Sequence, residues 1–149
     1  MTYRRRPTKT GRPAPRRGVK LPPERKFEPK LDTQAGVKVR STYEQQCADF
    51  FYSHDITFQY EPLMLLGGRQ FRPDFFLPDY DLFVEICGYG HMPHYRDHIK
   101  QKRQLYDKHG LRALFVEYSG RGSLVTLLRA ALEEAGVSFA SSRRDLRRG

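Results

Sequence analysis

Two stretches of sequence decide the fold: Phe71-Arg72-Pro73-Asp74-Phe75-Phe76-Leu77-Pro78 and, after a short gap, Leu82-Phe83-Val84-Glu85-Ile86-Cys87-Gly88. The first is an extended segment that ends at Pro78-Asp79. The second is a nearly continuous apolar run, which is typical of a central strand. If residues 72–77 and 82–86 pair as a hairpin, Asp74 and Glu85 approach each other at one end of the sheet.

The flanking sequence predicts helices and strands in alternation. Ser41-Thr42-Tyr43-Glu44 has the form of a capping box, and apolar residues recur after it at helical spacing. The predicted elements are a helix at 41–54, a strand at 57–60, an extended segment at 69–77, a strand at 81–86, a helix at about 93–108, a strand at 111–118 and a helix from 123 to about 135. This order predicts one α/β domain whose mixed four-stranded sheet is flanked by helices.

Charge divides the 149-residue chain, whose formal net charge is +10, into unlike parts. Residues 1–40 hold 13 of the 27 basic residues and only three acidic residues, whereas residues 41–140 hold ten basic and 13 acidic residues. Six of the ten prolines in the chain lie before residue 30. A segment so basic and so poor in large apolar residues cannot bury enough surface to fold. We therefore predict a disordered basic arm at 1–40, a folded domain at 41–140 and a basic tail at 141–149.

Several protein classes are excluded by composition. No apolar run is long enough for a membrane helix, and Met1–Arg6 leads into arginines and prolines without the apolar core of a signal peptide. The two cysteines, Cys47 and Cys87, are too few for a disulfide scaffold. These features indicate a protein of the cytoplasm or another intracellular setting, with no membrane partner.

Glu85 is the anomaly of the second strand, because a carboxylate inside an apolar run needs a cation, a proton or a hydrogen-bond donor. Together with Asp74 it could attract a hard divalent cation such as Mg²⁺, which can activate water beside a phosphate. Simpler interpretations stay open at this stage. Capping alone explains Glu44, turn chemistry could explain Asp74, and Glu85 could face solvent on an edge strand.

The two quoted stretches, with Glu44 on the helix upstream, resemble the PD-(D/E)XK nuclease superfamily over residues 41–118. The resemblance implies a restriction-endonuclease-like core and Mg²⁺-dependent hydrolysis of DNA phosphodiesters, with Mn²⁺ as a substitute. It also implies that Asp74, Glu85 and the main-chain carbonyl of Ile86 bind the metal. Glu44 would be a further ligand or would organise water.

One position departs from the family pattern, since the lysine expected two residues after the second acid is Cys87 here. Vsr-like endonucleases, including a homing group with a Glu-Asp-x-His-Asp signature, resemble this arrangement more closely. That resemblance makes His91 a general base or a water-orienting group, and Asp97 the acidic site residue on the following helix. Lys100 and Lys102 are candidates for a displaced lysine. The phage endonuclease I type of junction resolvase is a second branch with a similar helix.

Other chemistry is less well supported by the residues. Cys87, His91, His94 and His98 could bind Zn²⁺ by ligand type, but their spacing matches no standard structural site. A buried strand cysteine is usually inert packing rather than a nucleophile. Tyr89 or Tyr95 could stack on bases.

The sequence therefore predicts a small Mg²⁺-dependent DNA endonuclease whose arms supply phosphate affinity. The predicted DNA-binding residues are Arg4, Arg5, Arg6, Arg12, Arg16, Arg17, Lys20, Arg72, Lys102, Arg143 and Arg144. A symmetric substrate would require a homodimer. The alternatives are a non-catalytic nucleic-acid-binding protein that keeps the fold and a basic, ribosome-associated structural protein.

Overall fold

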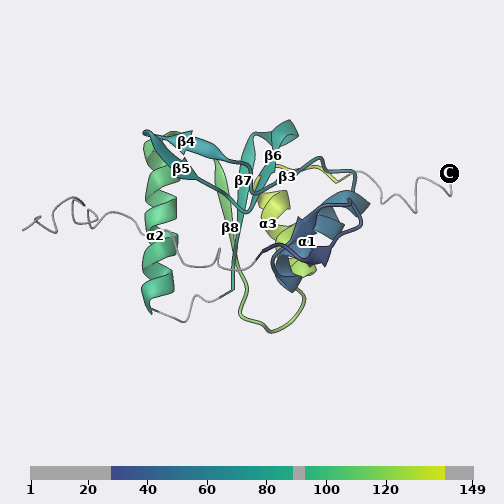
Figure 1. Ribbon diagram of the computed structural model, residues 1–149. Helices are drawn as coiled ribbons and strands as arrows, with labels where there is room; N and C mark the ends of the chain where they lie inside the picture. The colour runs from purple at the N-terminus through teal and green to yellow at the C-terminus, as the bar shows by residue number, and fades with distance from the viewer. Residues whose placement is uncertain (1–27, 89–92, 140–149) are drawn as a thin grey trace, which may run out of the picture.

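The computed structural model describes residues 28–88 and 93–139 of the chain, which form a mixed α/β structure (Figure 1). Its centre is a four-stranded mixed sheet with the order β3-β6-β7-β8. The strands of this sheet are β3 (Gln59–Tyr60), β6 (Phe75–Leu77), β7 (Leu82–Cys87) and β8 (Ala113–Glu117). The helices are α1 (Thr42–Ser53), α2 (Pro93–Lys108) and α3 (Leu124–Glu134), and a 3-10 turn at Pro78–Tyr80 joins β6 to β7.

The helices cover the two faces of the sheet unequally, with α1 and α3 on one face and α2 on the other (Figure 1). The side chains of β7 alternate between these faces. Val84 and Ile86 join the larger core with Phe51 and Leu128, whereas Phe83 joins a smaller core under α2. Because β7 is buried on both faces, its sequence is a nearly continuous apolar run, as predicted.

Helix α1 begins at the predicted cap. The Ser41 hydroxyl accepts a hydrogen bond from the backbone N–H of Glu44 at 3.1 Å and donates one to Glu44 Oε1 at 3.0 Å. The serine thus satisfies one of the N–H groups that a helix start leaves without a partner. Capping is therefore confirmed as one role of this pair, and it fixes the Glu44 carboxylate at the helix start.

The extended segment predicted at 69–77 is two strands in two different sheets. Residues Arg69–Phe71 form β5, which pairs with β4 (Met64–Leu66) in a separate hairpin, and β6 begins only at Phe75. The break falls at Arg72-Pro73, because proline has no N–H to continue a ladder. Gly67 and Gly68 turn the hairpin with positive φ angles of 59° and 79°. The hairpin lies over the end of α2 (Figure 1).

The predicted boundary of the arm at residue 40 is wrong. Strands β1 (Leu31–Asp32) and β2 (Lys38–Val39) form a hairpin, and Val39 is completely buried. The hairpin is held to α1 because Gln45 donates a hydrogen bond to the Asp32 carbonyl at 2.7 Å. The buried Val39 side chain, the β1–β2 pairing and the hydrogen bond from Gln45 therefore make residues 31–39 part of the folded structure, although their composition predicts an arm. Residues 1–27 of the predicted arm, the last residue of the predicted domain (140) and the whole predicted tail (141–149) lie outside the described residues.

None of the helices in the described parts of the chain combines the length and the apolar composition that crossing a membrane requires.

Candidate functional site

The hairpin of β6 and β7 brings the two predicted acids together. Phe75 pairs with Val84 in the antiparallel register, and one further step of this register places Asp74 opposite Glu85. Asp74 Oδ2 accepts a hydrogen bond of 2.8 Å from the backbone N–H of Ile86. The carboxylate of Asp74 is therefore held against the backbone of β7, beside Ile86, which directly follows Glu85 in the chain. The predicted hairpin is confirmed.

Glu85 is buried, with 2% of its surface exposed, and β7 is a central strand. The interpretation of Glu85 as a solvent-facing residue on an edge strand is therefore wrong. Its carboxylate lies between two donors from α2: Lys102 Nζ is 3.1 Å from Oε2, and the Tyr106 hydroxyl donates to Oε1 at 2.7 Å. The partner that a charge in an apolar strand requires is thus supplied by the helix that covers it.

The protonation of Glu85 is shifted by its surroundings. Burial, with the nearby charge of Asp74, raises the pKa of Glu85 to about 8, although Lys102 and the Tyr106 hydroxyl oppose this shift. Burial of the Tyr106 phenol and the adjacent Glu85 also raise the pKa of Tyr106 strongly. Tyr106 therefore stays a hydrogen-bond donor throughout the physiological pH range.

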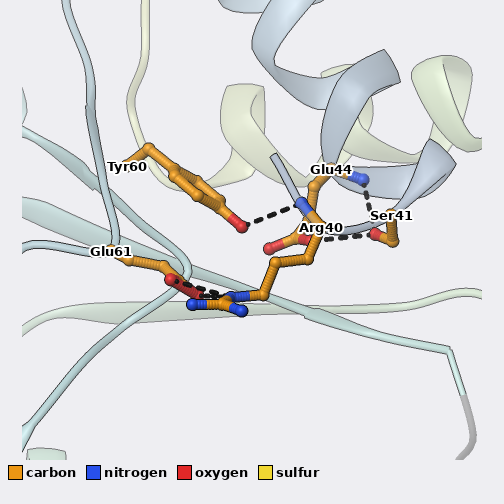
Figure 2. A network of polar contacts seen from close by, with 5 residues as sticks. All are labelled: Arg40, Ser41, Glu44, Tyr60 and Glu61. Atoms are coloured by element: carbon orange, nitrogen blue, oxygen red, sulfur yellow. Dashed lines mark hydrogen bonds and ion pairs between the residues drawn. The ribbon is translucent and has the colours of Figure 1, made fainter. Parts of the chain in front are cut away.

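Glu44 lies in a second network, on the α1 side (Figure 2). Besides Ser41, this network contains Tyr60 at the end of β3, whose hydroxyl accepts a 3.1 Å hydrogen bond from the backbone N–H of Arg40. The Arg40 Nε donates to both carboxylate oxygens of Glu61, at 2.7 and 3.1 Å. The ion pair of Arg40 and Glu61 ties the segment before α1 to the segment after β3, and so holds Tyr60 beside Glu44.

Glu44 is also shifted towards the protonated form. Burial is the largest cause, followed by the charge of Asp74, and together they raise the pKa of Glu44 to about 7. The hydroxyls of Ser41 and Tyr60 oppose the shift by hydrogen bonding. Asp74 therefore influences two buried glutamates, Glu44 from the α1 side and Glu85 from the α2 side.

The acids gather where β7 ends and α1 begins. A Cβ atom at Gly88 would meet the ring of Tyr43 at 3.1 Å, so glycine permits the N-terminus of α1 to approach the end of β7. The Cys87 carbonyl accepts from the backbone N–H of Tyr118, towards β8, whereas the Ile86 N–H points to Asp74. The N–H and C=O of one strand residue point to the same side, so the Ile86 carbonyl also faces the side of Asp74.

The donor set fits a hard divalent cation in its chemistry. Asp74, Glu85 and the Ile86 carbonyl all offer oxygen, the ligand that Mg²⁺ prefers. Burial, followed by the charge of Asp74, raises the pKa of Glu85, and a bound cation would oppose both effects by favouring the ionised carboxylate. Within the described residues, however, no group of three or more histidine, cysteine, aspartate and glutamate side chains has an arrangement that could hold a metal ion. A cation would therefore depend on two side chains and main-chain oxygen.

The remaining predicted site residues are distributed along α2 and β5. Asp97 and Lys100 are exposed on α2, and Arg72 is exposed after β5. Lys102 reaches Glu85, whereas Lys100 does not face it. Cys87 and His98 border a cavity of about 10 Å³ beside Glu85, as does Tyr95. His91, Tyr89, the His94 side chain and the arginines and lysine predicted in the arm and tail lie outside the described residues.

Sequence reasoning missed Tyr106, Tyr60, Arg40 and Glu61. A weak signal for Tyr106 exists, because Lys102 and Tyr106 are four residues apart and so share one face of a helix. No comparable local signal connects Arg40 with Glu61, which are 21 residues apart.

Comparison of the chain with protein-family models, with curated protein sequences and with solved structures gave no match.

Proposed function

We propose that the protein is a small Mg²⁺-dependent endodeoxyribonuclease with a restriction-endonuclease-like core of the PD-(D/E)XK type. The observation that carries the proposal is that Asp74, directly before β6, accepts a 2.8 Å hydrogen bond from the Ile86 N–H next to Glu85, while Lys102 lies 3.1 Å from Glu85. A lone structural carboxylate would not require a second acid opposite it. Two acids and a lysine at the end of a central strand are the components of phosphodiester hydrolysis.

We propose that Lys102 takes the place of the lysine that the family pattern has at the position of Cys87. The sequence lacks a lysine two residues after Glu85, but the ammonium group of Lys102 reaches the same carboxylate from α2. It thus provides positive charge beside the acid, where it can orient a water molecule or a phosphate oxygen. Among the two candidate lysines, we therefore propose Lys102 for this role and assign Lys100 to contact with the substrate.

Each acid has a distinct proposed task. Asp74, Glu85 and the Ile86 carbonyl would hold Mg²⁺, which when bound activates water and neutralises charge on the leaving oxygen. Tyr106 fixes the orientation of Glu85 through its 2.7 Å hydrogen bond. Glu44, with a pKa raised to about 7, can accept or release a proton near neutral pH at the α1 side of Asp74.

The test is cleavage of supercoiled plasmid and of linear, mismatched and four-way DNA by the full chain with Mg²⁺ or Mn²⁺. We expect cleavage that Asp74→Ala and Glu85→Ala each reduce at least about a hundredfold. Asp107→Ala, which removes an exposed acid of α2, is the control and should leave the rate unchanged. Circular dichroism of each variant separates loss of folding from loss of chemistry. Cleavage that survives Asp74→Ala would exclude this site.

A non-catalytic DNA-binding protein with the same fold is the second candidate. It is favoured by one observation: both oxygens of Glu85 already accept hydrogen bonds from within the chain. If the pair of Glu85 and Lys102 serves stability alone, the wild-type chain will bind DNA without cutting it under any of these metals.

A further inference from the structure

A groove of about 830 Å³ lies between α2 and the ends of β7 and β8, next to the paired acids. Its walls include Cys87 and Gly88, which directly follow Glu85-Ile86 in the chain. Cys87 and Ile99 also line the small cavity that Glu85 borders. The groove and that cavity therefore share two of their lining residues, which places the groove beside the proposed site.

Three basic residues of α2 line this groove: Arg96, Lys100 and Arg103. Their spacing places them within about 60° of one another around the helix and over about 10 Å of its length. One DNA strand advances about 3.4 Å along the duplex axis per phosphate, so this length corresponds to about three phosphates. All three residues are exposed, and the groove is thus a basic surface on a domain that has slightly more acidic than basic residues.

Glu117 is the acid in the lining of the groove, and it lies 3.5 Å from Arg103. The Arg103 guanidinium also stacks on the ring of Phe115, 4.3 Å from its centroid. The stacking keeps the guanidinium at the groove, while Glu117 partly neutralises it. A polyanion in the groove would therefore compete with Glu117 for Arg103.

We propose that this groove binds the phosphodiester backbone of one DNA strand through Arg96, Lys100 and Arg103, and leads that strand to Asp74 and Glu85. The inference deepens the proposed nuclease function and rests on it for the identity of the ligand. It adds a binding surface of the folded domain to the phosphate affinity expected from the basic arm.

α3 offers a matched control for the central pair of the groove. Arg129 lies 3.5 Å from Glu133, with exposure close to that of Arg103 and Glu117, and its guanidinium stacks on Phe139 at 5.0 Å. This second pair belongs to the helix on the other face of the sheet (Figure 1). The same substitution in either pair changes the net charge equally. A difference in DNA binding between the variants of the two pairs therefore reports the position of the pair rather than the net charge.

The experiment measures binding of a fluorescein-labelled mixed-sequence DNA duplex to the full chain by anisotropy, across a salt series in EDTA. We expect Arg96→Gln/Lys100→Gln/Arg103→Gln to reduce the slope of log K against log salt by about 2 to 3. The triple control Lys38→Gln/Lys108→Gln/Arg129→Gln should change it by less than about 1. Glu117→Gln should raise the affinity by about two- to tenfold, and Glu133→Gln should leave it unchanged.

Equal slopes for the two triple variants would overturn the groove, and so would equal affinities for Glu117→Gln and Glu133→Gln. The same measurement with an RNA duplex of the same sequence tests the identity of the ligand. If the triple groove variant loses affinity for the RNA duplex alone, DNA is not the ligand. The binding assay contains no metal, so its outcome is independent of cleavage. If the groove variants lose affinity while the wild type cuts no DNA, the groove stands without the nuclease; if the wild type cuts but both triple variants bind alike, the nuclease stands without the groove.

Discussion

The hydroxyl of Tyr106 donates a 2.7 Å hydrogen bond to Oε1 of Glu85, and both side chains are almost completely buried. The ring of Tyr106 packs at the same time against Phe71, Phe83 and Phe115. One residue of α2 therefore joins the smaller core to the carboxylate of the candidate site. The stability of this region and the orientation of Glu85 depend on the same side chain.

Tyr106→Phe tests this connection, because it keeps the ring and removes the donor. We expect a loss of about 1–3 kcal/mol in the free energy of unfolding, the effect of depriving a buried acceptor of its partner. Urea denaturation measures it. Tyr80→Phe is the control, since its hydroxyl bonds to the Ser138 carbonyl at an exposed position, and it should lose about 0.5 kcal/mol or less. Equal losses in the two variants would contradict a special role for the Tyr106 hydroxyl.

Lys102→Met should destabilise the protein in a pH-dependent way. The pKa of Glu85 is raised to about 8, so below pH 8 the glutamate holds a proton in both the wild type and the variant. Above pH 8 the wild-type carboxylate ionises beside Lys102, whereas the variant lacks this cation, so its Glu85 keeps the proton to a higher pH. We expect the loss to grow by about 1 kcal/mol between pH 8 and pH 9, the effect of one proton over one pH unit.

Urea denaturation at a series of pH values from 6 to 9 measures this dependence. The double variant Glu85→Gln/Lys102→Met is the control, because it carries neither charge and its loss should not vary with pH. A loss in Lys102→Met that is the same at every pH would show that the lysine contributes by packing alone.

Glu44 should make the protein less stable as the pH rises towards neutrality. Its pKa is raised from 4.5 to about 7 in the folded chain, so the folded state binds the proton more tightly than the unfolded state. Stability contributed by this proton is complete below pH 4.5 and is lost as the pH rises through 7. The shift corresponds to about 3 kcal/mol.

Glu44→Gln should abolish this part of the pH dependence and be more stable than the wild type at pH 8. Thermal melts in EDTA between pH 5 and pH 8 give the comparison, and Glu134→Gln, an exposed glutamate of α3, is the control. A slope that is unchanged in Glu44→Gln would mean that Glu44 is ionised in the folded protein throughout this range.

The ion pair of Arg40 and Glu61 should contribute more than an ordinary surface pair. The Glu61 side chain is only 8% exposed and that of Arg40 is 20% exposed, and two hydrogen bonds join them. We expect Arg40→Gln to reduce the free energy of unfolding by about 1–3 kcal/mol, because Glu61 would remain as a buried charge. Lys38→Gln breaks the exposed contact with Asp32 at 3.8 Å and should change stability by about 0.5 kcal/mol or less. If both variants unfold alike, the network around Glu44 does not depend on this pair.

The sequence by itself determined the elements whose signals are local. The cap at Ser41 involves residues three apart, and helix α2 has the predicted bounds 93–108. The hairpin of β6 with β7 follows from two apolar segments joined by a short turn, so the approach of Asp74 to Glu85 could be predicted. In each case the interacting groups are close in the chain, and a short pattern contains the necessary information.

Only the tertiary structure decided which lysine of α2 pairs with Glu85. Lys100 and Lys102 are two residues apart on α2 and so point to different sides of the helix. The burial of Ile99 and Tyr106 against the sheet sets the rotation of α2, which turns Lys102 towards Glu85 and leaves Lys100 in the groove. The hairpins of β1 with β2 and of β4 with β5, and the placement of Tyr60 beside Glu44, likewise depend on contacts between distant segments, whose free energy no local pattern contains.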